Sequence, residues 1–262
     1  MRISAFACPR TVSIFHLFLL FFILTSTTAA AWPQSAESGP YFARKNTFSV
    51  FGAYSNDSSH ILLGDAENRK LLDLGAAYAR RLFLNHIVNW QYSGEVLPIA
   101  LESDPTASET ISQTEPTQST RTGGIGAALL SCVPVSTAYS FTEANGTPVA
   151  YTITQFCSGR RWTVGEGISP VGFQWNFLPR RKLQPFFIGH GGYMYSTQPI
   201  PITQAGAFNF TFDLGAGFEL YRSKHRSVRA EYRYHHISNH DTAVTNPGID
   251  SGLFQLTYSF GR

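Results

Sequence analysis

Several segments of this chain alternate bulky apolar residues with small or polar residues, one position after the next. The segment 208–221 carries this pattern over most of its length. Its apolar set is Phe212, Leu214, Ala216, Phe218 and Leu220, and its small or acidic set is Asp213, Gly215, Gly217 and Glu219. Successive side chains of a β-strand point to opposite faces, so such a segment predicts a strand with one apolar and one polar face. This alternation is typical of a transmembrane β-strand.

Eight segments carry a strand pattern, and turn-forming residues separate most of them. Transmembrane barrels in bacteria have an even number of strands, and eight is the smallest size. We therefore predict an all-β fold, an eight-stranded antiparallel transmembrane β-barrel whose interior is filled by side chains, which argues against a porin. The alternative is a soluble lipocalin-like barrel or a β-sandwich, which would place bulky residues inside and charge outside. The segments are 47–54, 71–83, 86–101, 162–177, 183–195, 208–221, 228–238 and 253–260.

The N-terminus has the pattern of a secretory signal peptide. Arg2 and Arg10 supply positive charge, an apolar core follows over 12–24, and small residues come after it. We predict that residues 1–31 are a signal peptide, cleaved before Trp32. An uncleaved anchor helix is the alternative, although the core is shorter than the ~20 residues that a helical span requires. No later segment has an apolar run of that kind, so a membrane location requires a closed barrel and predicts the bacterial outer membrane.

The remainder of the chain divides by composition. Residues 32–46 are polar and contain Pro and Gly, so we predict an N-terminal segment that is either a mobile start or a short cap. Residues 47–262 form the predicted barrel domain. Within it, residues 102–125 are dominated by Ser, Thr, Glu, Pro and Gln. We therefore predict that 102–160 is one long loop insertion outside the cell, where barrel loops are long.

Two cysteines, Cys132 and Cys157, remain beyond the predicted signal peptide. In an exported protein we expect them to form a disulfide, and two free thiols are the alternative. Neither cysteine lies in a metal-ligand pattern, so we expect no metal site and no cofactor. The net charge of +3 is too small and too scattered to indicate a nucleic-acid partner.

The most distinctive stretch is 231–250, close to the C-terminus. In the predicted strand 228–238, the odd positions from Arg229 to His235 are charged or ionisable, so we expect them to face the interior and the even positions to face lipid. His236 and Ser238 then share the outer face. After a turn, Asp250 has the matching parity, and a hairpin would bring it to the same surface. A nucleophile, a base and an orienting carboxylate form a hydrolytic triad, and ordinary interface residues are the alternative.

These residues also resemble a known family. The segments His236-Ile237-Ser238-Asn239 and Asn246-Pro247-Gly248-Ile249-Asp250 resemble the C-terminal signature of the PagL-type lipid A 3-O-deacylases, an acyloxyacyl hydrolase-like outer-membrane family. Members are eight-stranded barrels that cleave the ester-linked acyl chain at position 3 of lipid A. The resemblance implies His236 as general base, Ser238 as nucleophile and Asp250 as orienting acid. It also implies that Asn239 helps to hold the oxyanion. The family acid is usually Glu, and here it is one methylene shorter.

The resemblance implies that lipid A, the anchor of lipopolysaccharide, is the substrate and lies among outer-membrane lipid beside the barrel. Four aromatic residues are candidates for the barrel wall that the acyl chains would contact, and each is also an ordinary lipid-facing aromatic. They are Tyr232, Tyr234, Phe254 and Tyr258. The predicted function is a serine esterase that hydrolyses the 3-O-linked acyl chain without a cofactor.

Two other functions remain open. A noncatalytic eight-stranded barrel would stabilise the envelope or bind a partner through residues 102–160. An outer-membrane phospholipase would also carry a His-x-Ser on the barrel exterior, but with an Asn as its third member and with more strands. The sequence does not indicate the preferred acyl-chain length or the oligomeric state.

Overall fold

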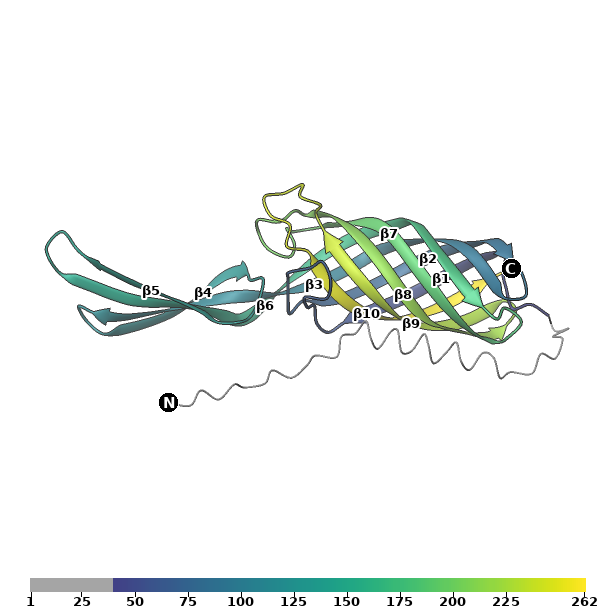
Figure 1. Cartoon of the computed structure of the whole chain (residues 1–262), viewed down its shortest axis with the longest axis horizontal. Helices are drawn as coiled ribbons and strands as arrows, with labels where there is room; N and C mark the ends of the chain where they lie inside the picture. The colour runs from purple at the N-terminus through teal and green to yellow at the C-terminus, as the bar shows by residue number, and fades with distance from the viewer. Residues whose placement is uncertain (1–39) are drawn as a thin grey trace, which may run out of the picture. The chain divides into compact units, whose positions relative to one another are not determined.

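The computed structural model describes residues 40–262, so the predicted signal peptide and residues 32–39 lie outside the described residues. The described part is built from ten β-strands (Figure 1). Within it, no helix is long and apolar enough to cross a membrane. The strands are β1 (Asn46–Ser55), β2 (Lys70–Leu84), β3 (Val88–Glu115), β4 (Ser119–Ala128), β5 (Val135–Thr142), β6 (Pro148–Phe177), β7 (Leu183–Ser196), β8 (Phe208–Ser223), β9 (Arg226–Ser238) and β10 (Ile249–Gly261).

Eight of these strands close into a ring. The pairing runs β3–β2–β1–β10–β9–β8–β7–β6, and β3 pairs with β6 to complete the circle. All of these pairs are antiparallel. The predicted eight-stranded antiparallel barrel is therefore confirmed. Each predicted segment overlaps one ring strand, and the large differences are at β3 and β6, which run well beyond their predicted ends.

The barrel is apolar outside and polar inside, as the alternation predicts. In β10 the outward side chains are about half exposed, whereas the inward ones are at most 2% exposed. The outward set is Phe254, Leu256, Tyr258 and Phe260, and the inward set is Gln255, Thr257 and Ser259. Bulky apolar side chains facing outward suit lipid surroundings and are inconsistent with a soluble barrel.

Several charged residues inside the barrel form ion pairs. Arg233 donates hydrogen bonds to both carboxylate oxygens of Glu95, at 2.9 and 2.8 Å, and to Glu231 at 3.0 Å. Nearer the other end, Arg44 contacts Glu219 at 2.6 Å. A buried charge is costly unless a partner compensates it. These ion pairs therefore explain how the inward face of β9 can carry charged residues.

Residues 40–45 lie across the end of the barrel that has the short turns. The Phe42 N–H donates to the Pro179 carbonyl at 2.7 Å. The Arg44 side chain is 3% exposed and also donates to the Ser227 hydroxyl at 2.6 Å. The described part of the segment 32–46 thus forms a cap that is tied to the barrel interior.

The two ends of the barrel differ in the length of their connections. One end has the short turns 85–87, 178–182 and 224–225, and the other has the longer connections 56–69, 197–207 and 239–248. Outer-membrane barrels keep short turns in the periplasm and long loops outside the cell. The end of β9 that carries His236 and Ser238 is therefore on the long-loop side.

The segment 102–160 differs from the loop insertion that we predicted, because it consists largely of strands. β3 and β6 stay paired beyond the barrel, β4 pairs with the outer part of β3, and β5 pairs with the outer part of β6. Residues 104–160 are called the arm, which projects from the barrel in Figure 1. Cys132 and Cys157 are joined by a disulfide within it.

The composition of the arm did not predict its strands, and the reason is physical. Both faces of this sheet are in contact with solvent over most of its length, so its strands do not require the bulky alternation of the barrel strands. Thr is favoured in strands, and the ladder between strands pairs backbone N–H and C=O groups as well in a polar sequence as in an apolar one.

The ion pairs inside the barrel lead to a stability prediction. We expect Arg233→Met to lower the free energy of unfolding by about 3–5 kcal/mol, because it leaves Glu95 and Glu231 buried without their cation. Urea unfolding in detergent, followed by gel mobility of the folded barrel, measures this change. Lys224→Met in an exposed turn is the control, with an expected change within about 0.5 kcal/mol. An unchanged midpoint for Arg233→Met would contradict this account of the interior.

Candidate active site

His236 and Asp250 lie directly opposite each other on β9 and β10. The strand register pairs the two residues, so both side chains point to the same outer face. The His236 ring nitrogen Nδ1 is 2.6 Å from the Asp250 oxygen Oδ1. An ionised carboxylate only accepts hydrogen bonds, so this contact places the ring proton on Nδ1. The sequence predicted a shared surface, and the register shows that the two side chains are in contact.

Asp250 is held by more groups than the sequence indicated. The Tyr234 hydroxyl donates to Oδ1 at 2.8 Å. The backbone N–H groups of Leu62 and Leu63 donate to Oδ2 at 2.6 and 2.7 Å. Both residues belong to the connection between β1 and β2, which covers Asp250 and leaves it fully buried. Nothing in the local sequence of that connection signalled a role, and Tyr234 was predicted only as part of the wall.

Ser238 lies on the same face as His236, two positions further along β9, and is half-buried. Residues two apart on a strand are ~6.6–6.8 Å apart along it, a distance that an imidazole leaning toward a hydroxyl can cover. Within residues 40–262 the Ser238 hydroxyl has no hydrogen bond, so its contact with His236 is not formed in this state. Because Nδ1 of His236 contacts Asp250, Nε2 is the ring nitrogen that could accept a hydrogen bond from Ser238.

Asn239 is placed inside the turn that follows β9. It is 1% exposed, and its side-chain amide donates to the Thr245 carbonyl at 2.7 Å. Its own backbone N–H donates to the Asn246 side-chain oxygen at 3.0 Å. The predicted role of Asn239, helping to hold the oxyanion, stays a prediction. These contacts fix its side chain within the turn.

The comparison with known families concerns this same region. Residues 136–259 match the model of the family described as lipid A 3-O-deacylase (PagL). This part of the chain is similar to the PagL family. The matched region runs from β5 into β10 and contains His236, Ser238 and Asp250. The resemblance that the short motif indicated is therefore confirmed.

Solved structures similar to this chain are β-barrels of the outer membrane. The outer membrane enzyme PagL has a TM-score of 0.42 at 12% identity, with 83% of this chain and 99% of that chain covered. Neisserial surface protein A has a TM-score of 0.39 at 10% identity, covering 83% and 97%. OprG from Pseudomonas aeruginosa has a TM-score of 0.37 at 10% identity, covering 84% and 98%. No curated protein matches the chain.

The predicted wall residues lie at different depths on β9 and β10. Tyr232 and Phe254 are register partners on the outer face, 55% and 52% exposed, and are four positions from His236 and Asp250. Tyr258 is eight positions from Asp250, which is ~26 Å along a strand. Tyr258 therefore belongs to the far part of the barrel wall, whereas Tyr232 and Phe254 lie nearer to His236 and Asp250.

Two aromatic residues on β8 flank the site and were not among the predicted wall residues. Phe210 is the register partner of Ser238, and Phe212 is the partner of His236. Both side chains are exposed on the outer face, and the Phe212 ring lies 6.3 Å from the Tyr234 ring. The alternation in β8 showed that these residues face lipid, but only the register places them beside Ser238.

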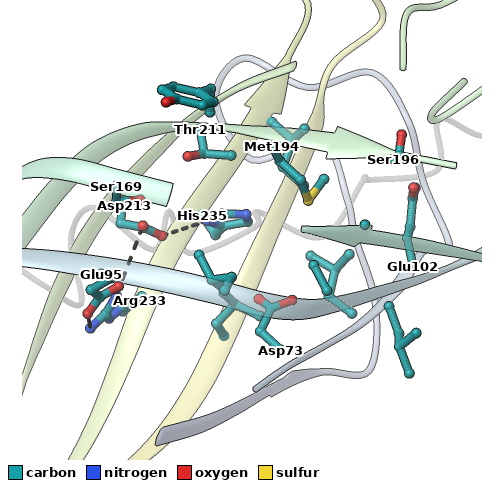
Figure 2. A pocket seen from close by; sticks show the side chains of 18 of the residues that line it. Asp73, Glu95, Glu102, Ser169, Met194, Ser196, Thr211, Asp213, Arg233 and His235 are labelled. Atoms are coloured by element: carbon teal, nitrogen blue, oxygen red, sulfur yellow. Dashed lines mark hydrogen bonds and ion pairs between the residues drawn. The ribbon is translucent and has the colours of Figure 1, made fainter. Parts of the chain in front are cut away.

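The interior of the barrel holds a second polar group of residues, which includes Asp213 and His235 (Figure 2). His235 contacts Asp213 at 2.6 Å, so the two neighbouring histidines each have an aspartate partner, one inside and one outside. A cavity of about 30 Å³ adjoins Asp213 and His235, which is room for ~2 water molecules. Position 237, the inward position after His235, is an isoleucine, so the inner group offers no equivalent of Ser238 there.

One interior cluster has the residue types of a metal site. Glu95, His190 and Asp213 each place a ligand-type atom within 4.8 Å of the others. Arg233 already donates to both oxygens of Glu95, however, and lies 4.0 Å from Asp213. The cluster therefore has a cation of its own, and we assign it a structural role in the barrel interior.

The contacts of Asp250 lead to a prediction that does not depend on activity. In Asp250→Asn, the amide has one oxygen to offer, while donors approach from His236 and Tyr234 on one side and from Leu62 and Leu63 on the other. We expect His236 to lose its Nδ1–H tautomer, or the loop to detach. Nitrogen-15 spectra of histidine-labelled protein in detergent would detect the first outcome, and hydrogen exchange at Leu62 and Leu63 would detect the second. Spectra and exchange identical to those of the wild type would disprove this arrangement.

Proposed function

We propose that this protein is an outer-membrane serine esterase that removes the 3-O-linked acyl chain of lipid A. Ser238 is the nucleophile, His236 is the general base, and Asp250 orients the imidazole. The observation that supports the proposal most strongly is the His236–Asp250 contact of 2.6 Å on the outer face, within a region that matches the PagL family. Contact with Asp250 directs the basic nitrogen Nε2 away from the acid, as the triad requires.

The proposed reaction has two stages. The Ser238 hydroxyl gives its proton to Nε2 of His236 while its oxygen attacks the ester carbonyl carbon of the 3-O-acyl chain. The bond between that carbon and the sugar oxygen then breaks, and the sugar oxygen takes the proton from the imidazolium. A water molecule next attacks the acyl-serine, again losing its proton to His236. Release of the fatty acid returns the proton to Ser238.

The position of the site on the barrel agrees with a lipid substrate. The three residues lie near the long-loop end, which is the outer side of an outer-membrane barrel. Lipid A occupies the outer leaflet there, so its acyl chains would lie against exposed aromatic residues without entering the barrel. Phe210, Phe212, Tyr232 and Phe254 supply that apolar surface. A substrate among membrane lipids requires no water-filled pocket in the protein.

Fatty-acid release from lipid A tests the proposal. Purified protein in detergent is given lipopolysaccharide, and mass spectrometry follows the loss of one acyl chain from lipid A. We expect Ser238→Ala to lower the rate on the order of 10³-fold or more, because it removes the oxygen that forms the acyl intermediate. Ser223→Ala, in the exposed region at the opposite barrel end, is the matched control and should keep wild-type activity.

Parallel reactions separate the alternatives. Release from phospholipid with none from lipid A would identify a phospholipase. An inactive wild type on both lipids would favour the noncatalytic barrel. If the Ser238→Ala protein is as active as the wild type, the mechanism with Ser238 as nucleophile is ruled out.

A further inference from the structure

We infer that the connection between β1 and β2 is a positioning clamp for Asp250, with Gly64 at its point of contact and Arg69 as its anchor to the arm. Residues 58–69 are called the clamp loop. The inference concerns how the triad is held, so its catalytic part rests on the proposed function. Neither Gly64 nor Arg69 lies near His236 or Ser238 in the sequence, and neither is a reacting group.

The clamp loop is attached to the start of β10 along its length. The Ser59 N–H donates to the Asp250 carbonyl at 3.1 Å, the Asp65 N–H to the Pro247 carbonyl at 2.6 Å, and the Ala66 N–H to the Gly248 carbonyl at 3.1 Å. Short bridges also join position 58 to 251 and position 66 to 249. The loop thus pairs with the backbone on both sides of Asp250.

At its tip, the loop approaches the Asp250 side chain so closely that only glycine is accommodated at position 64. A Cβ atom built on Gly64 would lie 2.5 Å from the Asp250 backbone nitrogen and 3.1 Å from its carboxyl carbon. The neighbouring backbone N–H groups of Leu62 and Leu63 are the two that hold Oδ2. A larger residue at position 64 must therefore move this part of the loop away from the carboxylate.

The other end of the loop is anchored by Arg69, which is fully buried. Its guanidinium donates to Asp104 at 3.3 Å, to the Pro201 carbonyl at 3.2 Å, and to the carbonyl oxygens of Leu129 and Leu130 at the root of the arm. The fork of five N–H groups on an arginine is what allows one side chain to reach so many acceptors.

Three further contacts join the loop to the arm beside Arg69. The Glu67 N–H donates to the Leu130 carbonyl at 2.7 Å, and the Ser131 hydroxyl donates to the Glu67 carboxylate at 2.8 Å. The Cys132 N–H donates to the Asn68 side-chain oxygen at 3.3 Å, next to the disulfide. The insertion that contains the arm is therefore connected to the candidate site through the clamp loop.

The clamp determines which oxygen of Asp250 faces His236. Oδ2 is occupied by the loop N–H groups, so Oδ1 is the oxygen that receives the His236 ring and the Tyr234 hydroxyl. If the loop withdraws, the carboxylate is free to rotate, and His236 loses its fixed orientation. Such a loss would slow the chemical step more than it would weaken substrate binding.

Gly64→Ala is the first test. We expect kcat for fatty-acid release to fall on the order of 100-fold with little change in KM. A displacement of a catalytic group by about 1 Å has an effect of this size in enzyme active sites. We also expect nitrogen-15 spectra to show loss of the fixed Nδ1–H tautomer of His236. Gly123→Ala is the matched control, because a Cβ at Gly123 in the arm meets no atom within 4 Å. It should keep both wild-type values.

Arg69→Lys tests the anchor without altering the residues around Asp250, and it decides the matter if Gly64→Ala does not fold. Lysine keeps the buried charge but lacks the planar guanidinium with its five N–H donors. We therefore expect the same fall in kcat and the same loss of the Nδ1–H tautomer of His236, measured on protein that migrates as a folded barrel. A wild-type His236 tautomer and kcat in either folded variant would overturn the inference for that residue. If wild-type protein releases no fatty acid, the tautomer still reports on the clamp, so failure of the function and failure of the clamp are distinguishable.

Discussion

The pairing of β3 with β6 is the interaction on which the rest of this structure depends. In lipid, an unpaired strand edge leaves N–H and C=O groups without partners, so a sheet can cross the membrane only as a closed ring. The β3–β6 ladder closes that ring and then continues past it, where β4 and β5 add to the same two strands and form the arm. One ladder thus joins the membrane barrel to an insertion with a very different composition.

Closure of the barrel creates two chemically distinct surfaces from each strand. The inner surface holds Arg233, Glu95 and their neighbours as compensated ion pairs, and the outer surface is apolar. His236 and Asp250 are polar residues on that otherwise apolar outer surface. The clamp loop buries the Asp250 carboxylate and stabilises it there. A polar group beside lipid is stable only when its hydrogen bonds are satisfied, and the Asp250 carboxylate receives four. The stability of the acid and its orientation toward His236 therefore have the same source.

The proposed chemistry depends on this use of the outer wall. A lipid substrate diffuses in the membrane plane and meets the barrel from the side, so residues inside the barrel are not available to it. The arm contacts the clamp loop, and the clamp loop contacts Asp250. The insertion therefore takes part in holding the candidate site, and this role is separate from binding a partner. That role was not apparent while 102–160 was interpreted as a loop.

The sequence by itself determined the strand alternation, the number of barrel strands, the inward and outward faces, and the membership of His236, Ser238 and Asp250 in one surface. These properties follow from side-chain period and turn spacing, which are local. It did not determine the arm, because a solvated sheet has no bulky alternation to detect. Only the tertiary structure brought Leu62, Leu63 and Gly64 to Asp250 and placed Phe210 beside Ser238. Those contacts join residues as many as 188 positions apart, and strand register and loop closure, which no local pattern encodes, decide them.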